Sequence, residues 1–420
     1  MTNIKTTTLS NGLRVITDHV PSMHSVALGV WAGVGAQFER AENNGTAHML
    51  EHMMFKGTAK RNAMEIAESI ESVGGSMNAY TSREITSYHI HLLHEHMPLA
   101  LETIADMYQN STLPMEEVER ERQVILQEIG MCHDTPDDLI FDQYYEAAYP
   151  DQAFGAPILG TVPIIEGMPR ETLFDFMKTH YTPKRSVISA AGNVDHDAFV
   201  ALVEAHFNAL PDDVEASAGN ADYKGGERRT DKDLEQAHFI LGFPSVGRTS
   251  PDFYTAQALS TLFGGGMSSR LFQEVREKRG LVYSIFSFNA AHQDGGQFGI
   301  YAGTGAESLP EIMPVICDEI GKVTQNVSEA EVERAKAQLK SSLLMGRESM
   351  MTRADQHARH LLFRDAVFDI DAVIAQVDEV CAARIKTVAK DIFSTKPTLA
   401  ALGPLGGLEG YDALTARLAA

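Results

Sequence analysis

Residues 45–55 have the sequence GTAHMLEHMMF and contain the pattern H-x-x-E-H. In a helix, positions i, i+3 and i+4 share one face, so the side chains of His48, Glu51 and His52 converge. The residues between them are apolar, which predicts a buried helix. Two imidazoles and a carboxylate on a buried helix need polar partners, and a metal ion supplies them. A buried His/Glu network without a metal is the alternative.

Zinc is the metal that this donor set suits best. Neutral imidazole nitrogen and carboxylate oxygen are zinc ligands, and three protein ligands with an open water position are typical of a catalytic site. Glu51 lies on the ligand face and is a candidate general base, which takes a proton from water and passes it to the leaving amine. We therefore predict one zinc ion per chain, with Glu51 beside it.

A third protein ligand is expected to be a distant carboxylate. The helical segment 116–130 offers Glu116, Glu117, Glu119, Glu121 and Glu128. Glu121 and Glu128 are seven residues apart, which is two helical turns on the same face. The apolar run 124–126 lies between them, so this helix must also pack inward. Glu119 is better explained as part of a solvated face.

Length and composition describe a large globular chain. Its 420 residues suffice for two to four domains with a sizeable core. No stretch approaches the roughly 20 consecutive apolar residues that a membrane span needs, and residues 1–11 lack the profile of a secretory signal. The three cysteines are far apart and form no CxxC pair, which favours a reducing compartment. We predict a cytoplasmic protein with no membrane span, and a bacterial cytoplasm fits.

The charge balance restricts the partners. The formal net charge is −22, so no nucleic acid is expected to bind, because binding requires a compensating basic face. An acidic surface attracts basic peptides. It also serves solubility alone, and both interpretations stay open.

The clearest break in the sequence is Pro211 to Asp231, which has almost no large apolar residue. This composition predicts an exposed linker between an N-terminal half, residues 1–210, and a C-terminal half, residues 232–420. Each half has a Val-Glu-Arg triplet that opens a long helical segment, at residues 118–120 and 332–334. Similar alternation precedes both triplets. We therefore favour an internal duplication over two chance matches.

Strand and helix patterns alternate in both halves. Strands are predicted at 13–17, 25–31, 86–93, 239–243, 282–287 and 297–302. Amphipathic helices lie between them, for example at 63–73, 98–109 and 329–344. Strands followed by helices in each half predict an α+β fold whose sheets are covered on one face by helices.

Residues 119–128 have the sequence ERERQVILQE. Together with the H-x-x-E-H motif, this stretch resembles the pitrilysin/insulinase family of inverzincin metallopeptidases, and within it the β-subunit of mitochondrial processing peptidase and its bacterial relatives. The resemblance covers nearly the whole chain. It implies two homologous halves, each a duplicated α/β sandwich with mostly antiparallel sheets covered by helices, which form a clamshell around an extended peptide.

The resemblance also implies roles for individual residues. Glu128 corresponds to the third zinc ligand, beside His48 and His52. Glu121 corresponds to a second glutamate that this family requires, which orients the zinc shell. The segment 74–82, with Asn78, Ala79 and Tyr80, corresponds to an edge strand to which the substrate backbone adds. An ordinary turn and strand is the alternative for this segment.

In the C-terminal half, the family places an arginine and a tyrosine seven residues apart that bind the substrate backbone and stabilise the oxyanion. Arg276 and Tyr283 have this spacing, and both side chains are donors toward a developing negative charge. A surface arginine and a core tyrosine are the alternative. This half has no H-x-x-E-H, and alignment by the triplets places Ala335 and Ser342 opposite Glu121 and Glu128. It therefore resembles a degenerate, non-metal copy.

These residues together predict an active zinc endopeptidase that hydrolyses extended or unfolded peptides, for processing or degradation, in a closed chamber. Because one chain holds both the zinc motif and the Arg/Tyr pair, the resemblance implies self-sufficient catalysis and a homodimer. The alternative is a non-catalytic peptide-binding or structural subunit of the same family. The intact metal motif weighs against it.

Overall fold

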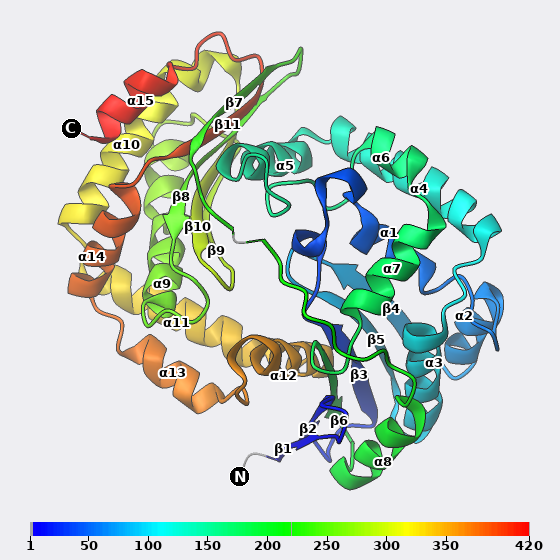
Figure 1. The fold of residues 1–420 in the computed structure, drawn as a ribbon. Helices are drawn as coiled ribbons and strands as arrows, with labels where there is room; N and C mark the ends of the chain where they lie inside the picture. Colours follow the sequence, from blue (N-terminus) through cyan, green and yellow to red (C-terminus); the bar gives the residue numbers. More distant parts are fainter. Residues whose placement is uncertain (1–2, 220, 420) are drawn as a thin grey trace. The chain divides into compact units, whose positions relative to one another are not determined.

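The computed structural model describes residues 3–219 and 221–419. Its contacts divide the chain into two compact units, each made of three segments. The first unit holds residues 3–130, 156–219 and 345–368, and the second holds 131–155, 221–344 and 369–419. The bar in Figure 1 identifies these segments by colour. The division into an N-terminal half, residues 1–210, and a C-terminal half, residues 232–420, stays a prediction. The compact units differ from these halves because residues 131–155 belong to the second unit and residues 345–368 to the first.

The first unit is built on one six-stranded sheet with the order β1-β2-β6-β3-β5-β4. All neighbours are antiparallel except β2 and β6. The strands are β1 (Ile4–Thr8), β2 (Arg14–His19), β3 (Ser25–Ala32), β4 (Ser76–Thr81), β5 (Thr86–Leu93) and β6 (Ser186–Gly192). The strands predicted at 13–17, 25–31 and 86–93 are confirmed as β2, β3 and β5.

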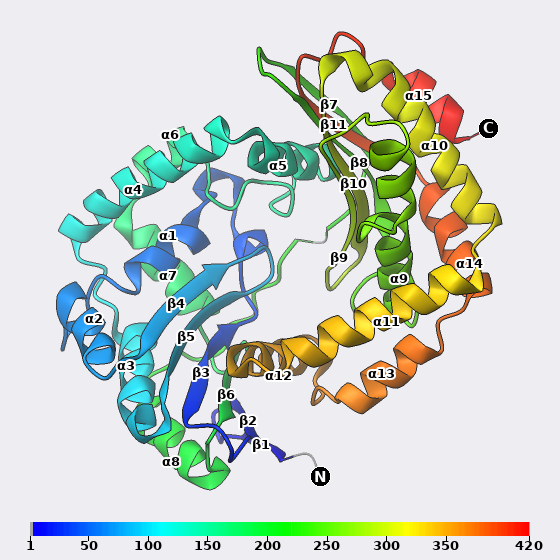
Figure 2. The same cartoon turned by 180° about the vertical axis from the view of Figure 1, so that it is seen from behind.

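The main core of the first unit lies on one face of this sheet, where apolar strand residues such as Val30 and Ile90 meet the helices. Strict alternation in β5 turns Tyr88, Ile90 and Leu92 inward. The helices on this side are α1 (Thr46–Met53), α2 (Ala63–Glu71), α3 (Met97–Asn110), α6 (Val162–Gly167), α7 (Arg170–His180) and α8 (His196–His206). Figure 2 shows α2 and α3 beside β4 and β5.

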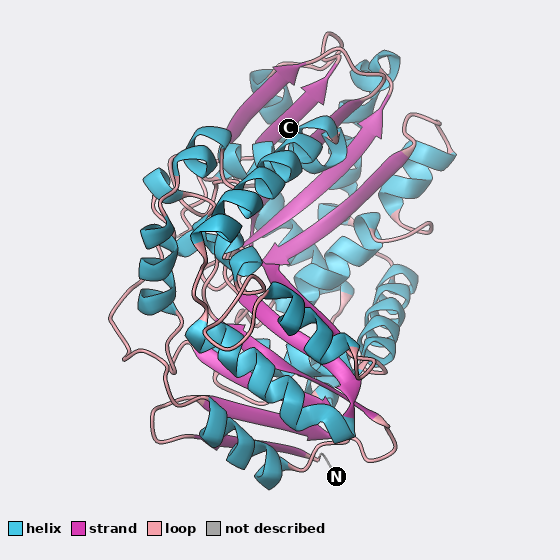
Figure 3. Cartoon of the chain, turned by 90° about the vertical axis from the view of Figure 1, so that its right-hand side faces the viewer, coloured by secondary structure: helices cyan, strands magenta, loops and turns pink. Residues whose placement is uncertain are grey.

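The second unit repeats this plan with a five-stranded sheet of order β7-β11-β8-β10-β9. Here only β7 and β11 are parallel. Its strands are β7 (Gly226–Asp231), β8 (Ala237–Ser245), β9 (Ser284–Ala291), β10 (Gly296–Thr304) and β11 (Thr398–Gly403). Its helices are α9 (Phe253–Gly264), the π-helix η4 (Phe272–Glu277), α10 (Leu309–Gln325), α13 (Ile370–Asp378), α14 (Ala382–Phe393) and α15 (Tyr411–Leu418). Figure 3 shows both sheets with their flanking helices.

The order of elements confirms the predicted duplication. The triplet-bearing helices α4 (Met115–Asp134) and α11 (Glu329–Gly346) occupy the same place in each half. A further helix follows each of them, α5 (Pro136–Ala148) and α12 (Met350–Arg364). The strand orders also correspond, with β1 as an addition in the first unit. The chain is an α+β protein with two homologous halves and mostly antiparallel sheets.

Helices α5 and α12 are exchanged between the sequence halves. Helix α12 packs against β6, β3 and β2, and α5 packs against β11, β8 and β7. Trp31 and Val187 of the first sheet join Ala354 and Leu361 of α12 in one buried cluster. Helices therefore cover both faces of each sheet, and the expectation of one covered face is wrong. Periodicity shows that a helix has an apolar face, but not which sheet this face covers.

An ion cluster fixes α12 on the first sheet. Oδ2 of Asp18 on β2 accepts hydrogen bonds from Arg353 Nη1 at 2.9 Å, Arg347 Nη2 at 3.1 Å and His357 Nε2 at 3.1 Å. Asp18 is buried. Burial raises the pKa of Asp18, but the hydrogen bonds from His357 and Arg353 and their charges outweigh burial and lower it to about 2. The cluster therefore favours the ionised carboxylate in the folded chain.

Replacing Asp18 with asparagine is expected to lower the free energy of unfolding by about 3 kcal/mol at pH 7, because two guanidinium groups lose their anionic partner. The pKa of Asp18 is about 2 in the folded chain against 3.8 for a free side chain. The contribution of ionised Asp18 to the free energy of unfolding is therefore present above about pH 4 and is lost as the pH falls toward 2. Urea unfolding at pH 7 and at pH 3 measures the free energy of unfolding of wild type and of Asp18→Asn. The difference between the two proteins should be smaller at pH 3.

The control for this variant is Asp365→Asn, which removes the same charge from a carboxylate that is 87% exposed and lies 3.4 Å from Arg14. It should change stability by less than about 0.5 kcal/mol. Equal stability of Asp18→Asn and wild type at pH 7 would contradict the role of the cluster.

The predicted linker is shorter than expected. Residues 211–219 and 221–225 form no helix or strand, whereas residues 226–231 are β7. This strand has a polar sequence because it lies at the edge of its sheet and is mostly solvated. None of the helices in the described ranges is long and apolar enough to cross a membrane.

Candidate metal centre

Helix α1 begins at a buried cap supplied by another segment. Gly45 precedes the helix with φ of 94°, and a Cβ there would lie 2.7 Å from the Ile165 side chain. The Glu39 carboxylate accepts hydrogen bonds from the backbone N–H of Gly45 at 2.8 Å and of Ala47 at 2.7 Å. Burial raises the pKa of Glu39 to about 7, against the opposing effect of these hydrogen bonds. This cap fixes where α1 starts and thus the direction of its side chains.

Helices α1 and α4 bring three predicted ligands together. His48 and His52 of α1 and Glu128 of α4 each offer a ligand atom within 4.8 Å of the others. Glu128 Oε2 lies 3.8 Å from His48 Nε2 and 3.7 Å from His52 Nε2. It is the one such cluster of His, Cys, Asp and Glu within residues 3–219 and 221–419.

The geometry of this cluster fits a tetrahedral metal ion. Glu128 Oε2 is buried and has no hydrogen-bond partner among the described residues, and both imidazole nitrogens are too distant to serve as one. Zinc ligands at about 2.0–2.2 Å from the ion stand about 3.3–3.6 Å apart in a tetrahedron. The separations of Glu128 Oε2 from the two imidazole nitrogens, 3.7 and 3.8 Å, lie slightly above that range. Burial, together with the nearby His52, lowers the pKa of His48 to about 4, so its imidazole is neutral, as a ligand must be.

Glu121 contacts His52 on the ring nitrogen that is turned away from Glu128. Its Oε2 lies 2.9 Å from His52 Nδ1, and its Oε1 accepts from Lys56 Nζ at 2.7 Å. Burial raises the pKa of Glu121, but the hydrogen bonds from Lys56 and His52 outweigh burial, and the pKa is lowered. With the Nδ1–H bound to this carboxylate, the Nε2 lone pair of His52 is free to face Glu128. Sequence reasoning missed Lys56, although its position four residues after His52 is a usable signal.

Glu51 lies on the same helix but outside the three-residue cluster. Burial raises its pKa, and a hydrogen bond with the Thr81 side chain and the nearby His52 offset only part of that effect. Thr81 is the last residue of β4. The candidate base is therefore held between the metal cluster and the end of an edge strand, which suits a proton acceptor placed next to a bound peptide.

The predicted substrate segment forms the edge of the first sheet. Strand β4 pairs with β5 on one side only. The N–H of Ala79 donates to the Oδ1 atom of Asn78 at 2.8 Å in an exposed hydrogen bond, which indicates that it faces the free side of the strand. The Tyr80 side chain lies on the α12 face and donates to Asp355 at 2.5 Å. Among the three predicted residues, Asn78 and Ala79 thus border the free edge, and the Tyr80 hydroxyl points away from it.

Two family models match successive parts of the chain. A model of the insulinase family, peptidase family M16, matches residues 14–162, and a model of the peptidase M16 inactive domain matches residues 167–339. An uncharacterized zinc protease of Rickettsia felis is 40% identical over 410 residues, which cover 97% of this chain and 99% of the relative. The chain belongs to peptidase family M16. An uncharacterized zinc protease of Bacillus subtilis is 37% identical and covers 96% of this M16 chain and 99% of its own length.

Solved structures show the same fold. The crystal structure of a protease from Helicobacter pylori has a TM-score of 0.88 and 25% identity to this M16 chain, and covers 96% of it and 100% of its own chain. A peptidase M16 inactive domain from Pseudomonas fluorescens has a TM-score of 0.90 and 20% identity, with coverage of 97% and 99%. At 20% identity, the likeness to the Pseudomonas fluorescens structure concerns the fold alone.

The second unit of this M16 chain places Arg276 and Tyr283 beside each other. The Arg276 guanidinium carbon lies 5.7 Å from the centre of the Tyr283 ring and 4.7 Å from that of Phe272. Tyr283 is 76% exposed, so the alternative of a core tyrosine is wrong. The counterpart of Glu121 in this unit, Ala335, is fully buried. The match to an inactive-domain model covers this region.

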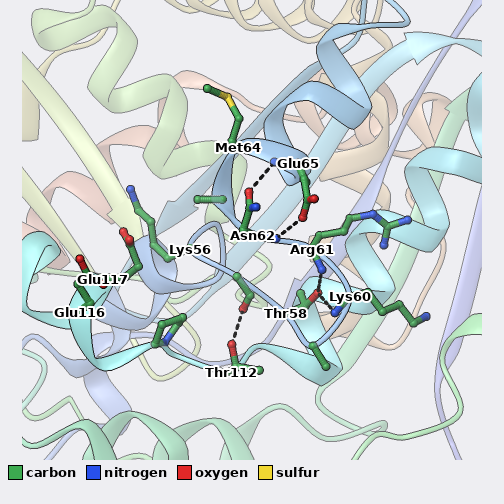
Figure 4. A pocket seen from close by; sticks show the side chains of 14 residues that line it. Lys56, Thr58, Lys60, Arg61, Asn62, Met64, Glu65, Thr112, Glu116 and Glu117 are labelled. Carbon is green, nitrogen blue, oxygen red and sulfur yellow. Dashed lines mark hydrogen bonds between the residues drawn. The ribbon is translucent and has the colours of Figure 1, made fainter.

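A pocket of about 540 Å³ lies at the start of α2, and Lys56 lines it as well as binding Glu121. Several of its polar groups have partners, either within the pocket or just outside it. Figure 4 shows Asn62 and Glu65 joined by two hydrogen bonds, and the Arg61 guanidinium binds carboxylates of α3. None of the three metal-cluster residues lines this pocket.

Proposed function

We propose that this chain is a zinc-dependent endopeptidase that hydrolyses extended peptides. The observation that carries the proposal is the cluster of His48, His52 and Glu128, with an unpartnered carboxylate oxygen at 3.7 and 3.8 Å from two imidazole nitrogens. Bacterial relatives over the full length that are named zinc proteases support it.

The residues have separate tasks in this proposal. His48, His52 and Glu128 hold the zinc ion, which supplies Lewis-acid polarisation of the scissile carbonyl and a water of lowered pKa. Glu51 takes the proton of the attacking water and gives it to the leaving amine nitrogen. Glu121 orients the His52 ring through its hydrogen bond to Nδ1. Arg276 and Tyr283 donate to the peptide backbone and to the oxyanion that forms on the carbonyl.

We propose that the peptide adds to β4, beside Asn78 and Ala79. Edge strands bind extended peptides through main-chain hydrogen bonds, which tolerate many sequences. The corresponding edge strand of the second unit, β9, packs closely against α9. A Cβ on Gly264 of α9 would lie 2.3 Å from the backbone N of Ser287, and Ser287 Oγ donates to the Ser260 carbonyl at 2.8 Å.

Three finer features belong to the same proposal. We expect basic peptides to be preferred because the chain carries a net charge of −22. A homodimer and a cytoplasmic location follow from the family resemblance and from the widely separated cysteines. Light scattering tests the dimer, and fractionation of cells tests the location. Neither measurement depends on the metal chemistry.

Removal of zinc is expected to abolish peptide cleavage, and zinc readdition is expected to restore it. The substrate is a quenched, arginine-containing peptide of 15 to 20 residues, and mass spectrometry identifies the cut bonds. The matched control is a folded protein that contains the same peptide sequence in a helix, which should stay intact. Peptide that binds the zinc-loaded chain and is recovered uncut would contradict the proposal and favour a non-catalytic peptide-binding or structural subunit. Cleavage that is unaffected by chelation would indicate a contaminant.

A further inference from the structure

We propose that Asp355 of α12 is a positioning residue of the peptide site: it holds the edge strand β4 in place through Tyr80. This inference rests on the proposed addition of the peptide to β4. It assigns a task to a helix that comes from the other half of the sequence. It also predicts that loss of this contact weakens peptide binding and leaves the metal centre intact.

One carboxylate oxygen joins two strands to α12. Oδ1 of Asp355 accepts hydrogen bonds from the Tyr80 hydroxyl of β4 at 2.5 Å and from Nε1 of Trp31 of β3 at 3.0 Å. Trp31 is fully buried, and the Asp355 side chain is 27% exposed. Hydrogen bonds to an ionised acceptor are about twice as strong as neutral ones. The carboxylate therefore connects the interior of the sheet with its edge strand.

Arg359 and His89 surround this contact. Arg359 Nη1 lies 4.0 Å from the second oxygen of Asp355, Oδ2. The ring of His89 lies 6.4 Å from the Trp31 ring and 6.3 Å from the Tyr80 ring. Burial of Tyr80 and the Asp355 charge raise the pKa of the Tyr80 hydroxyl, so it stays a donor. The Tyr80 side chain is thus held at both ring and hydroxyl.

An edge strand needs such an anchor more than an inner strand does. Inner strands are fixed by hydrogen bonds on both sides, whereas β4 pairs only with β5. Ala79, whose N–H faces the free side, directly precedes Tyr80. A shift of Tyr80 therefore moves the backbone groups that an added peptide must meet. The metal ligands are on α1 and α4, which make none of these contacts.

Two substitutions remove the contact from opposite sides. Tyr80→Phe deletes only the donor, and Asp355→Ala deletes the acceptor. Each is expected to raise the Kd of a labelled extended peptide, and KM for its cleavage, by about 5- to 10-fold, as the loss of one charged hydrogen bond allows. The turnover number should stay within about twofold of wild type. Asp355→Asn keeps one acceptor oxygen and is expected to restore most of the affinity.

The Kd is measured by fluorescence anisotropy in a Glu51→Gln background, so that binding is seen without cleavage. The double variant Tyr80→Phe/Asp355→Ala should bind no more weakly than Asp355→Ala alone, because Asp355→Ala already removes the bond that Tyr80→Phe removes. Asp365→Asn, on the exposed end of the same helix, is the control for loss of charge. Circular dichroism of each variant reports folding, because the emission of Trp31 responds directly to the loss of its bond with Asp355.

Three results would overturn the inference: an unchanged Kd in both single variants, additive effects in the double variant, or loss of zinc together with loss of affinity. Failure of the proposed function gives a different pattern. If the wild-type chain binds the peptide and does not cut it, a raised Kd in Tyr80→Phe still supports the anchor. If the wild type binds no extended peptide, both proposals are wrong.

Discussion

Glutamine in place of Glu51 is expected to reduce peptide turnover by about 10²–10⁴-fold, the usual contribution of a general base. Glutamine has the size of glutamate and still bonds with Thr81, but it cannot take a proton from water. Because Glu51 lies outside the cluster of His48, His52 and Glu128, the variant should keep one zinc ion per chain. Turnover and zinc content are measured on the same preparation.

The matched control for Glu51→Gln is Glu116→Gln, which makes the same change on a side chain that is 78% exposed at the start of α4. It should have wild-type turnover. Equal turnover in Glu51→Gln and wild type would mean that another group is the base. A variant that loses both zinc and turnover would mean that Glu51 is a ligand.

Glutamine in place of Glu128 is expected to abolish zinc binding and turnover together. An amide oxygen is a weaker zinc ligand than a carboxylate, and two imidazoles alone do not hold the ion. We expect zinc affinity to fall by more than about 100-fold, beyond the effect of residues that only support ligands. Atomic absorption after dialysis against a weak chelator measures the zinc that remains.

Folding should be unaffected in Glu128→Gln, because this side chain is 35% exposed and its Oε2 has no partner among the residues that the structure describes. Removing an unpaired carboxylate therefore costs little stability. Circular dichroism and thermal unfolding in the absence of zinc provide the check. Full zinc content in Glu128→Gln would show that the third ligand lies elsewhere.

The metal centre was largely predictable because its signal is local. Helical spacing places His48 and His52 on one face, and the structure confirms that they converge with Glu128. Spacing alone did not distinguish Glu121 from Glu128, since both lie on one face of α4. The family resemblance assigned their roles. In the structure, Glu128 Oε2 lies near both His Nε2 atoms, and Glu121 bonds His52 Nδ1.

The parts that could not be predicted depend on contacts between distant segments. The Glu39 cap of α1, the Asp18 cluster and the bond from Tyr80 to Asp355 join residues with no shared periodicity. The exchange of α5 and α12 is of the same kind. Strand β7 was missed for a different reason: its sequence is polar, so neither alternation nor an apolar run marks it.

The second unit differs from the first in the length of one helix. Helix α9 runs from Phe253 to Gly264 and lies against β9, whereas α1 ends at Met53. Gly264 permits the close approach of α9 to Ser287.

The proposed function requires that His48, His52 and Glu128 share a single zinc ion. Anomalous diffraction at the zinc edge, from crystals of the zinc-loaded chain, tests this claim directly. We predict one strong peak per chain, within bonding distance of both Nε2 atoms and of the Glu128 carboxylate, about 2.0–2.2 Å from each. A peak at another site, or no peak at this cluster in a fully loaded crystal, would contradict the account.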